Sequence, residues 1–141
     1  MIDGMSEQIV RLMYETLPLE ISIIDANDEI VGWNKHETRL FKRPLTAMNI
    51  NFRYYEPDEV LPKAEAIIQQ MKAGTCNRAH LWFDLKPEDH GKKQKVLIEF
   101  YALRDFAGKY LGCMECTHNV SAEDRDETLK KGAPAPIFNI A

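Results

Sequence analysis

The closing segment, residues 104–121, constrains the fold most, because it has the pattern of the last hairpin of an antiparallel sheet. Runs of β-branched and aromatic residues cover positions 96–103 and 111–120. Three residues typical of turns lie between them: Asp105, Gly108 and Lys109. The sequence therefore predicts strands near residues 95–104 and 110–119, joined by a tight turn.

Three shorter strands and two helices are expected upstream. Apolar or alternating runs predict strands near residues 21–24, 30–34 and 79–85. Apolar residues recur at intervals of three and four over positions 60–71, which predicts a helix. A second, amphipathic helix is expected before residue 17, where Ser6 can cap its start. Residues 34–41 also suggest a helix, and residues 46–49 a short helical turn.

Length and charge limit the function. A chain of 141 residues suits one domain, and we expect an N-terminal helix over 1–16, the domain over 17–124 and a tail over 125–141. The net charge of -4 gives no basic surface for nucleic acid. No apolar run reaches the roughly 18 residues of a membrane helix, and no signal pattern is present. We therefore expect a cytoplasmic protein without nucleic-acid or membrane partners.

The cysteines favour structural roles. Cys113 and Cys116 have the spacing of redox and zinc sites, but residues three apart on a strand point to opposite faces. A zinc site completed by Cys76 and His80 is the alternative, and it demands specific geometry. We interpret the cysteines as buried and without metal.

The order of two strands, a helical segment and a three-stranded meander resembles the PAS domain family. Asn34 is similar to the family's asparagine that opens the helical segment. Asn49 stands where the family usually has glycine, and asparagine tolerates a left-handed conformation. Three stretches resemble the family's closing pattern: Arg104-Asp105, Gly108 with Gly112, and His118-Asn-Val-Ser-Ala-Glu.

Two longer stretches resemble the PAS domain found C-terminal to hemerythrin-type domains: Leu17-Pro-Leu-Glu-Ile-Ser-Ile-Ile-Asp and Tyr110-Leu-Gly-Cys-Met-Glu-Cys-Thr. The resemblance covers residues 17–124. It implies an α+β fold with a five-stranded antiparallel sheet, helices on one face and the N-terminal helix on the other. It also implies a sensory or regulatory binding module. Glu56-Pro57 departs from that subgroup, which shows His-Pro there, so no metal or haem role transfers to this position.

The resemblance implies that a ligand would lie between the inner sheet face and the long helix. Alternation groups Ile98, Phe100 and Ala102 with Gly112, Met114 and Cys116, and this set carries no charge, so we place it inward. A small apolar ligand and a filled core are equal alternatives. The expected ligand-binding residues are Ile67, Met71, Leu81, Phe83, Ile98, Phe100, Met114 and Cys116.

The sequence does not identify a cofactor. Haem needs an axial ligand, and residues 57–73, where haem-binding members carry theirs, contain no histidine. Photoreceptor flavin chemistry needs a cysteine in the early helical region, and residues 34–52 contain none. Both cofactors are therefore disfavoured.

The opposite sheet face predicts a homodimer. It would carry an apolar patch that the amphipathic N-terminal helix of the same chain or of a partner could cover. The expected interface residues are Ile9, Met13, Leu17, Tyr101, Leu103 and Leu111. We expect signalling through this dimer or to a separate partner protein.

A small acid–base enzyme is the alternative function. If Leu103 pairs with Leu111, Glu99 falls opposite Glu115 on the outer face, and facing carboxylates could share a proton. Solvated or neutralised glutamates are the favoured interpretation, since no nucleophile set or phosphate loop accompanies them. We therefore expect a binding module rather than an enzyme.

Overall fold

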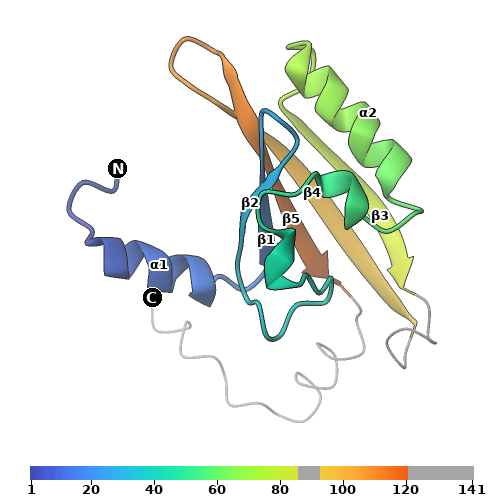
Figure 1. Cartoon of the computed structure of the whole chain (residues 1–141), viewed down its shortest axis with the longest axis horizontal. Coiled ribbons are helices and arrows are strands. Elements are labelled where there is room, and N and C mark those ends of the chain that lie inside the picture. Colours follow the sequence, from blue (N-terminus) through green and yellow to red (C-terminus); the bar gives the residue numbers. More distant parts are fainter. Residues whose placement is uncertain (86–92, 121–141) are drawn as a thin grey trace, which may run out of the picture.

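The computed structural model describes residues 1–85 and 93–120, and the tail expected over 125–141 lies outside them. One antiparallel sheet has the strand order β2-β1-β5-β4-β3 (Figure 1). Its strands are β1 (Glu20–Asp25), β2 (Ile30–Trp33), β3 (Arg78–Leu85), β4 (Gln94–Arg104) and β5 (Tyr110–Asn119). The helices are α1 (Glu7–Thr16) and α2 (Leu61–Lys72), with 3-10 turns η1 (Leu45–Ala47) and η2 (Phe52–Tyr54). The five predicted strands and both main helices are confirmed.

Helix α2 packs its apolar stripe on the inner face of β3 and β4 and completes the apolar core. Ala64, Ile68 and Met71 of the helix are fully buried, as are Ile98 and Phe100 of β4. Burying a large apolar side chain stabilises the fold by roughly 1.5–3 kcal/mol. The sequence periodicity of α2 therefore reports its packing face directly.

Helix α1 begins where expected, because the Ser6 hydroxyl accepts a hydrogen bond from the Ile9 amide at 3.1 Å. The helix buries none of its residues. Only its last turn is held against the sheet, where the Tyr14 hydroxyl approaches Gly32 of β2 on the outer side. In the view of Figure 1 the rest of α1 extends beyond the β2 edge. The outer face of β4 is therefore not covered by this helix.

The segment after β2 is not the helix that residues 34–41 suggested. Lys35 has a left-handed backbone with φ of 53°, and this turns the chain away from a helical path. The Arg39 side chain then binds the carbonyls of Asn34 and Phe41, groups that a helix would use in its own backbone bonds. Asn49 does adopt the left-handed conformation that the PAS-like pattern implies, with φ of 62°.

The pairing of β4 with β5 corrects the predicted face of β5. Leu103 pairs with Gly112, and the register shifts between Leu103 and Arg104. A slip of one residue moves every side chain to the other face. Met114 and Cys116, which we expected to face inward, therefore lie on the outer face, while Cys113 and Glu115 face inward.

Gly112 is required where β1 and β5 meet. A Cβ atom at this position would lie 2.4 Å from the carbonyl oxygen of Ile24, far closer than real contacts allow. Glycine lets the two backbones approach at the point where the strand register is set. The close contact between the β1 and β5 backbones therefore explains why glycine occupies position 112 in the closing motif.

The same register removes the facing pair of glutamates. Glu99 pairs with Cys116, whereas Glu115 pairs with Phe100, so the two carboxylates lie on opposite faces of the sheet. The acid–base site predicted from these two residues is wrong. The expectation that Cys113 and Cys116 diverge is confirmed, and burial raises the pKa of both thiols.

Candidate functional site

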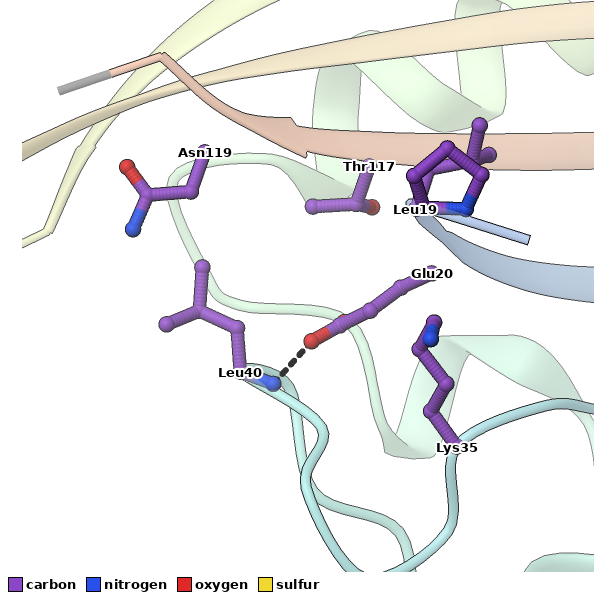
Figure 2. A pocket seen from close by; sticks show the side chains of 7 residues that line it. Leu19, Glu20, Lys35, Leu40, Thr117 and Asn119 are labelled. Carbon is purple, nitrogen blue, oxygen red and sulfur yellow. Dashed lines mark hydrogen bonds between the residues drawn. The ribbon is translucent and has the colours of Figure 1, made fainter. Parts of the chain in front are cut away.

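A pocket of about 300 Å³ opens where β1 starts and β5 ends, on the side of the segment that follows β2. Figure 2 shows the Glu20 side chain between Leu40, Thr117 and Lys35. Seven residues line the pocket: Pro18, Leu19, Glu20, Lys35, Leu40, Thr117 and Asn119. The wall is therefore partly apolar and carries two opposite charges.

Glu20 connects this pocket to the protein interior. It is the first residue of β1 and is 8% exposed. Its carboxylate accepts a hydrogen bond from the Leu40 amide, and a longer one of 3.4 Å from the Phe41 amide. The guanidinium of Arg39 lies 3.7 Å from the same carboxylate. A group that binds Glu20 in the pocket would therefore act on the segment after β2 as well.

Arg39 holds that segment to the sheet from inside. The residue is 3% exposed, so water satisfies almost none of its donors. The guanidinium instead donates four hydrogen bonds of 2.9–3.2 Å, to the Ser22 hydroxyl and to the carbonyls of Ile21, Asn34 and Phe41. These side-chain bonds help to fix a stretch of chain that has no regular secondary structure.

Asn34 joins the same region to α1. Its side-chain oxygen accepts from the Ile21 amide at 2.7 Å, and its amide group donates to the carbonyls of Tyr14 and Leu19 at 2.9 and 3.0 Å. The residue is fully buried. Asn34, which the resemblance to PAS domains singled out, therefore links the last turn of α1 to β1 and to the segment after β2.

A second buried ionic cluster lies deeper on the inner face. Glu115 of β5 faces inward beside Glu56, which lies between η2 and α2, and the Arg43 guanidinium lies 3.9 Å from the Glu56 carboxyl. Burial raises the pKa of Glu56 well above its usual value, and the neighbouring Glu115 raises it further. The structure therefore favours a protonated Glu56.

The charges of the whole cluster balance if one carboxyl group keeps a proton. Two buried guanidinium groups face three buried carboxyl groups: Arg39 and Arg43 against Glu20, Glu56 and Glu115. We interpret the raised pKa of Glu56 as the way in which the interior avoids a net charge.

Several polar atoms of this cluster lack a partner. Nε and Nη1 of Arg43, Oε1 of Glu56 and Oε2 of Glu115 are buried and form no hydrogen bond. Unsatisfied buried polar atoms are rare and costly in folded proteins. Their concentration here marks the region as specialised for something other than packing.

The predicted ligand residues lie elsewhere. None of the eight lines the pocket. Six are on α2 or the inner face of β3 and β4, namely Ile67, Met71, Leu81, Phe83, Ile98 and Phe100, while Met114 and Cys116 are on the outer face. Their role as ligand contacts stays a prediction.

The predicted dimer residues remain accessible in the single chain. Ile9 and Met13 of α1 are 52% and 44% exposed, and Leu111 of β5 is 50% exposed. Leu17, Tyr101 and Leu103 are half-buried. The structure does not bring the α1 stripe onto the outer sheet face of its own chain.

Sequence reasoning missed the charged residues of the site. Arg39 lies in the segment 34–41 that was expected to be helical, Arg43 lies just after that segment, and Glu115 was placed on the wrong face. One signal was available: Glu56-Pro57 stands where the resembling subgroup shows His-Pro. That departure marked a position at which an ionisable side chain enters the interior. Among the described residues, no group of three potential metal ligands gathers anywhere.

Residues 10–121 match a family model described as PAS domain. The chain belongs to the PAS domain family. PAS domains are commonly sensory modules, for instance in histidine kinases, and are typically not catalytic. Across the part of the chain that the structure describes, no helix combines the length and apolarity needed to cross a membrane.

Solved structures of similar fold come from several bacteria. A C-terminal domain from Streptococcus mutans is 22% identical, with a TM-score of 0.70 over 86% of this chain and 90% of that one. The PAS domain of Bordetella pertussis BvgS is 14% identical, with a TM-score of 0.63, covering 88% and 91%. A sensory box sensor histidine kinase from Vibrio cholerae is 16% identical, with a TM-score of 0.57, covering 84% and 94%. These likenesses show the fold. No curated protein matches the sequence.

Proposed function

We propose that this PAS domain is a sensory or regulatory module that binds a small molecule in the pocket beside Glu20. The single observation that carries the proposal is the link from the pocket to the buried ions. Glu20 lines the pocket and also binds the backbone and side chain of the segment 39–41. A ligand that contacts Glu20 would shift these bonds, and this is how occupancy becomes a structural signal.

The proposal moves the ligand away from the apolar face on which sequence reasoning placed it. Side chains from α2, β3 and β4 pack together there as a buried core. The pocket at the end of β1 offers polar groups and space of a size typical for small ligands. Binding rather than turnover is proposed, because the pocket shows no nucleophile paired with a base.

The signal is proposed to leave through a homodimer, in the cytoplasm, to a separate partner protein. The exposed apolar stripe of α1 and the outer face near Leu111 support this, since exposed apolar patches commonly mark interaction surfaces. Asn34 supports it as well, because it binds both the end of α1 and β1 next to the pocket. A relationship to PAS domains that follow hemerythrin-type domains is part of the proposal and rests on the sequence motifs.

Native mass spectrometry of the purified chain, with an absorbance spectrum, tests ligand binding. We expect a small molecule that is released on denaturation. A variant that fills the pocket, Leu40→Trp, should lose it, whereas Leu45→Trp on the exposed turn η1 should keep it. Retention of the molecule by Leu40→Trp, or absence of any bound or stabilising small molecule for the original chain, would overturn the proposed site.

The dimer is tested by sedimentation of an Ile9→Glu, Met13→Glu double variant beside the original chain. Both side chains are exposed in the single chain, so charge there leaves the fold intact and breaks only an interface. Arg11→Gln on the polar side of α1 is the control. A truncation starting at Leu17 adds a second reading. If the original chain and the double variant sediment as the same species, α1 does not build the interface.

A further inference from the structure

Two opposite charges line the pocket without pairing with each other. Glu20 reaches the pocket from β1, and Lys35 reaches it from the turn after β2 (Figure 2). Lys35 is half-buried, and its ammonium group forms no ion pair with any residue in the described ranges, 1–85 and 93–120. The Lys35 ammonium and the Glu20 carboxylate are more than 4.0 Å apart.

Glu20 keeps capacity to bind a further donor. A carboxylate offers about four acceptor positions. The Leu40 amide occupies one, while the Phe41 amide at 3.4 Å and the Arg39 guanidinium at 3.7 Å are long contacts. A ligand ammonium group can therefore approach Glu20 from the pocket side.

The remaining walls favour a short aliphatic body with one polar neighbour. Leu19 and Leu40 face the same space as the two charges, and Pro18 adds a third apolar wall. Thr117 lines the pocket from β5, and its hydroxyl can donate or accept. A volume of about 300 Å³ lies at the lower end of ligand pockets, which suits a molecule far smaller than a nucleotide, flavin or haem.

We infer that the pocket binds a small zwitterion of the aliphatic amino-acid class, with its ammonium group on Glu20 and its carboxylate on Lys35. This inference rests on the proposed function. A ligand with one charge meets repulsion, because an amine alone approaches Lys35 and an acid alone approaches Glu20. A molecule that carries both signs pairs with both side chains and bridges the gap that keeps them from pairing with each other.

Isothermal titration of the full chain with three related probes tests the inference: leucine, its decarboxylated amine 3-methylbutylamine, and its deaminated acid 4-methylpentanoate. We expect leucine to bind and each singly charged probe to bind about tenfold more weakly or worse, since a charge-assisted hydrogen bond is lost. Valine and isoleucine extend the series, and native mass spectrometry of the protein as purified reports the molecule it carries.

Variants assign the two charges. Lys35→Gln should weaken leucine binding about tenfold, whereas 3-methylbutylamine should bind as well or better, because the variant removes the ammonium group that repels the amine. Glu20→Gln keeps an acceptor for the Leu40 amide and should weaken both leucine and 3-methylbutylamine, whereas 4-methylpentanoate should bind as well or better. Lys63→Gln on the exposed side of α2 is the matched control and should change nothing.

The outcomes separate this inference from the proposed function. Equal binding of leucine and either singly charged probe, or leucine binding that Lys35→Gln leaves intact, overturns the zwitterion. The purified chain could instead release a neutral or singly charged molecule that Leu40→Trp no longer carries. That result would overturn the zwitterion inference but support the proposed pocket. If no molecule is carried and no probe binds, the inference and the proposed function both fail.

Discussion

The inner face of the sheet has two unlike halves. Over β3 and β4 it is apolar, and side chains such as Ile98 and Phe100 pack on α2. Over β1 and β5 the same face carries ions, among them Glu20 and Glu115, which meet Arg39 and Arg43 from the segment between β2 and α2. Both halves are buried to a similar degree, so exposure does not explain the difference.

The two halves differ in the free energy of burying their side chains. Apolar burial stabilises the fold by roughly 25 cal/mol for each Å² removed from water. Buried ion pairs lose hydration that their mutual attraction often fails to repay, and apolar replacements of similar volume are commonly neutral or stabilising. The apolar half therefore accounts for stability, and the ionic half is retained for another reason. Local rules tend to be broken at functional sites, which is where the pocket lies.

The largest expected effect is in the apolar half. Phe100→Ala removes a fully buried ring from beneath α2 and should lower the free energy of unfolding by about 3–5 kcal/mol. Phe106→Ala, in the exposed turn between β4 and β5, is the control and should have almost no effect. Urea unfolding measures both. A similar small loss for the two variants would show that this half does not dominate stability.

Removing one charged side chain from the ionic half is expected to lower the free energy of unfolding slightly less. Arg39→Met leaves the Glu20 carboxylate without its cation and removes one donor from each of three carbonyls, so the free energy of unfolding should fall by about 3 kcal/mol. Arg11→Met on the exposed face of α1 controls for loss of charge. Unlike Phe100→Ala, Arg39→Met should also change the pocket, read as loss of the bound molecule in native mass spectrometry.

The sequence predicted the apolar half far better than the ionic half. Periodicity located α2 and its buried face, and the strands of the meander were found from alternation because each has one apolar face. The predicted face of β5 was wrong because the residues from Cys113 to Thr117 are buried on both sides of the sheet, except for Met114, which is half-buried, so alternation does not distinguish the two faces there. The bulge beside Leu103 then decided the register, and a bulge leaves no periodic signal.

The ionic site was missed for a different reason. Asn34, Arg39 and Arg43 act from a stretch with no regular structure, where contacts depend on tertiary folding rather than on spacing along the chain. A buried arginine has the same sequence appearance as a surface one. Asn49 was easier to interpret because its role is local, a left-handed backbone, whereas Asn34 was singled out only by the family resemblance, since its partners lie 13–20 residues away in the sequence.

The pH dependence of the free energy of unfolding should also distinguish the ionic half from the apolar half. We expect this effect to be smaller than that of Arg39→Met. The pKa of Glu56 is raised in the folded state, where the groups facing it are Glu115 of β5 and the guanidinium groups of Arg43 and Arg39. The folded state then binds the proton more tightly than the unfolded chain. Stability is fully present below the ordinary carboxyl pKa and is lost as pH rises through the folded value.

Urea unfolding at several pH values should therefore show stability falling by about 1.4 kcal/mol for each unit by which the pKa is raised. Glu56→Gln keeps a neutral polar group and should flatten this slope, whereas Glu37→Gln, on the exposed surface, should leave it unchanged. A slope that persists in Glu56→Gln would assign the proton to another group. Phe100→Ala should lower the whole curve without altering its slope.

The smallest effect is expected on the outer face, where ions contact water. Glu99 is bound by Arg78 at 3.0 Å, by the Tyr101 hydroxyl at 2.8 Å and by His118 at 3.0 Å. The hydrogen bonds from Tyr101 and Arg78 lower the pKa of Glu99, the direction opposite to Glu56. Glu99→Gln should nevertheless change the free energy of unfolding by less than about 1 kcal/mol, because exposed ion pairs are screened by water and salt. Urea unfolding at low and high salt checks this. A loss of stability as large as that expected for Arg39→Met would contradict this prediction. It would show that burial does not explain why the inner ionic cluster contributes more to the free energy of unfolding than the outer one.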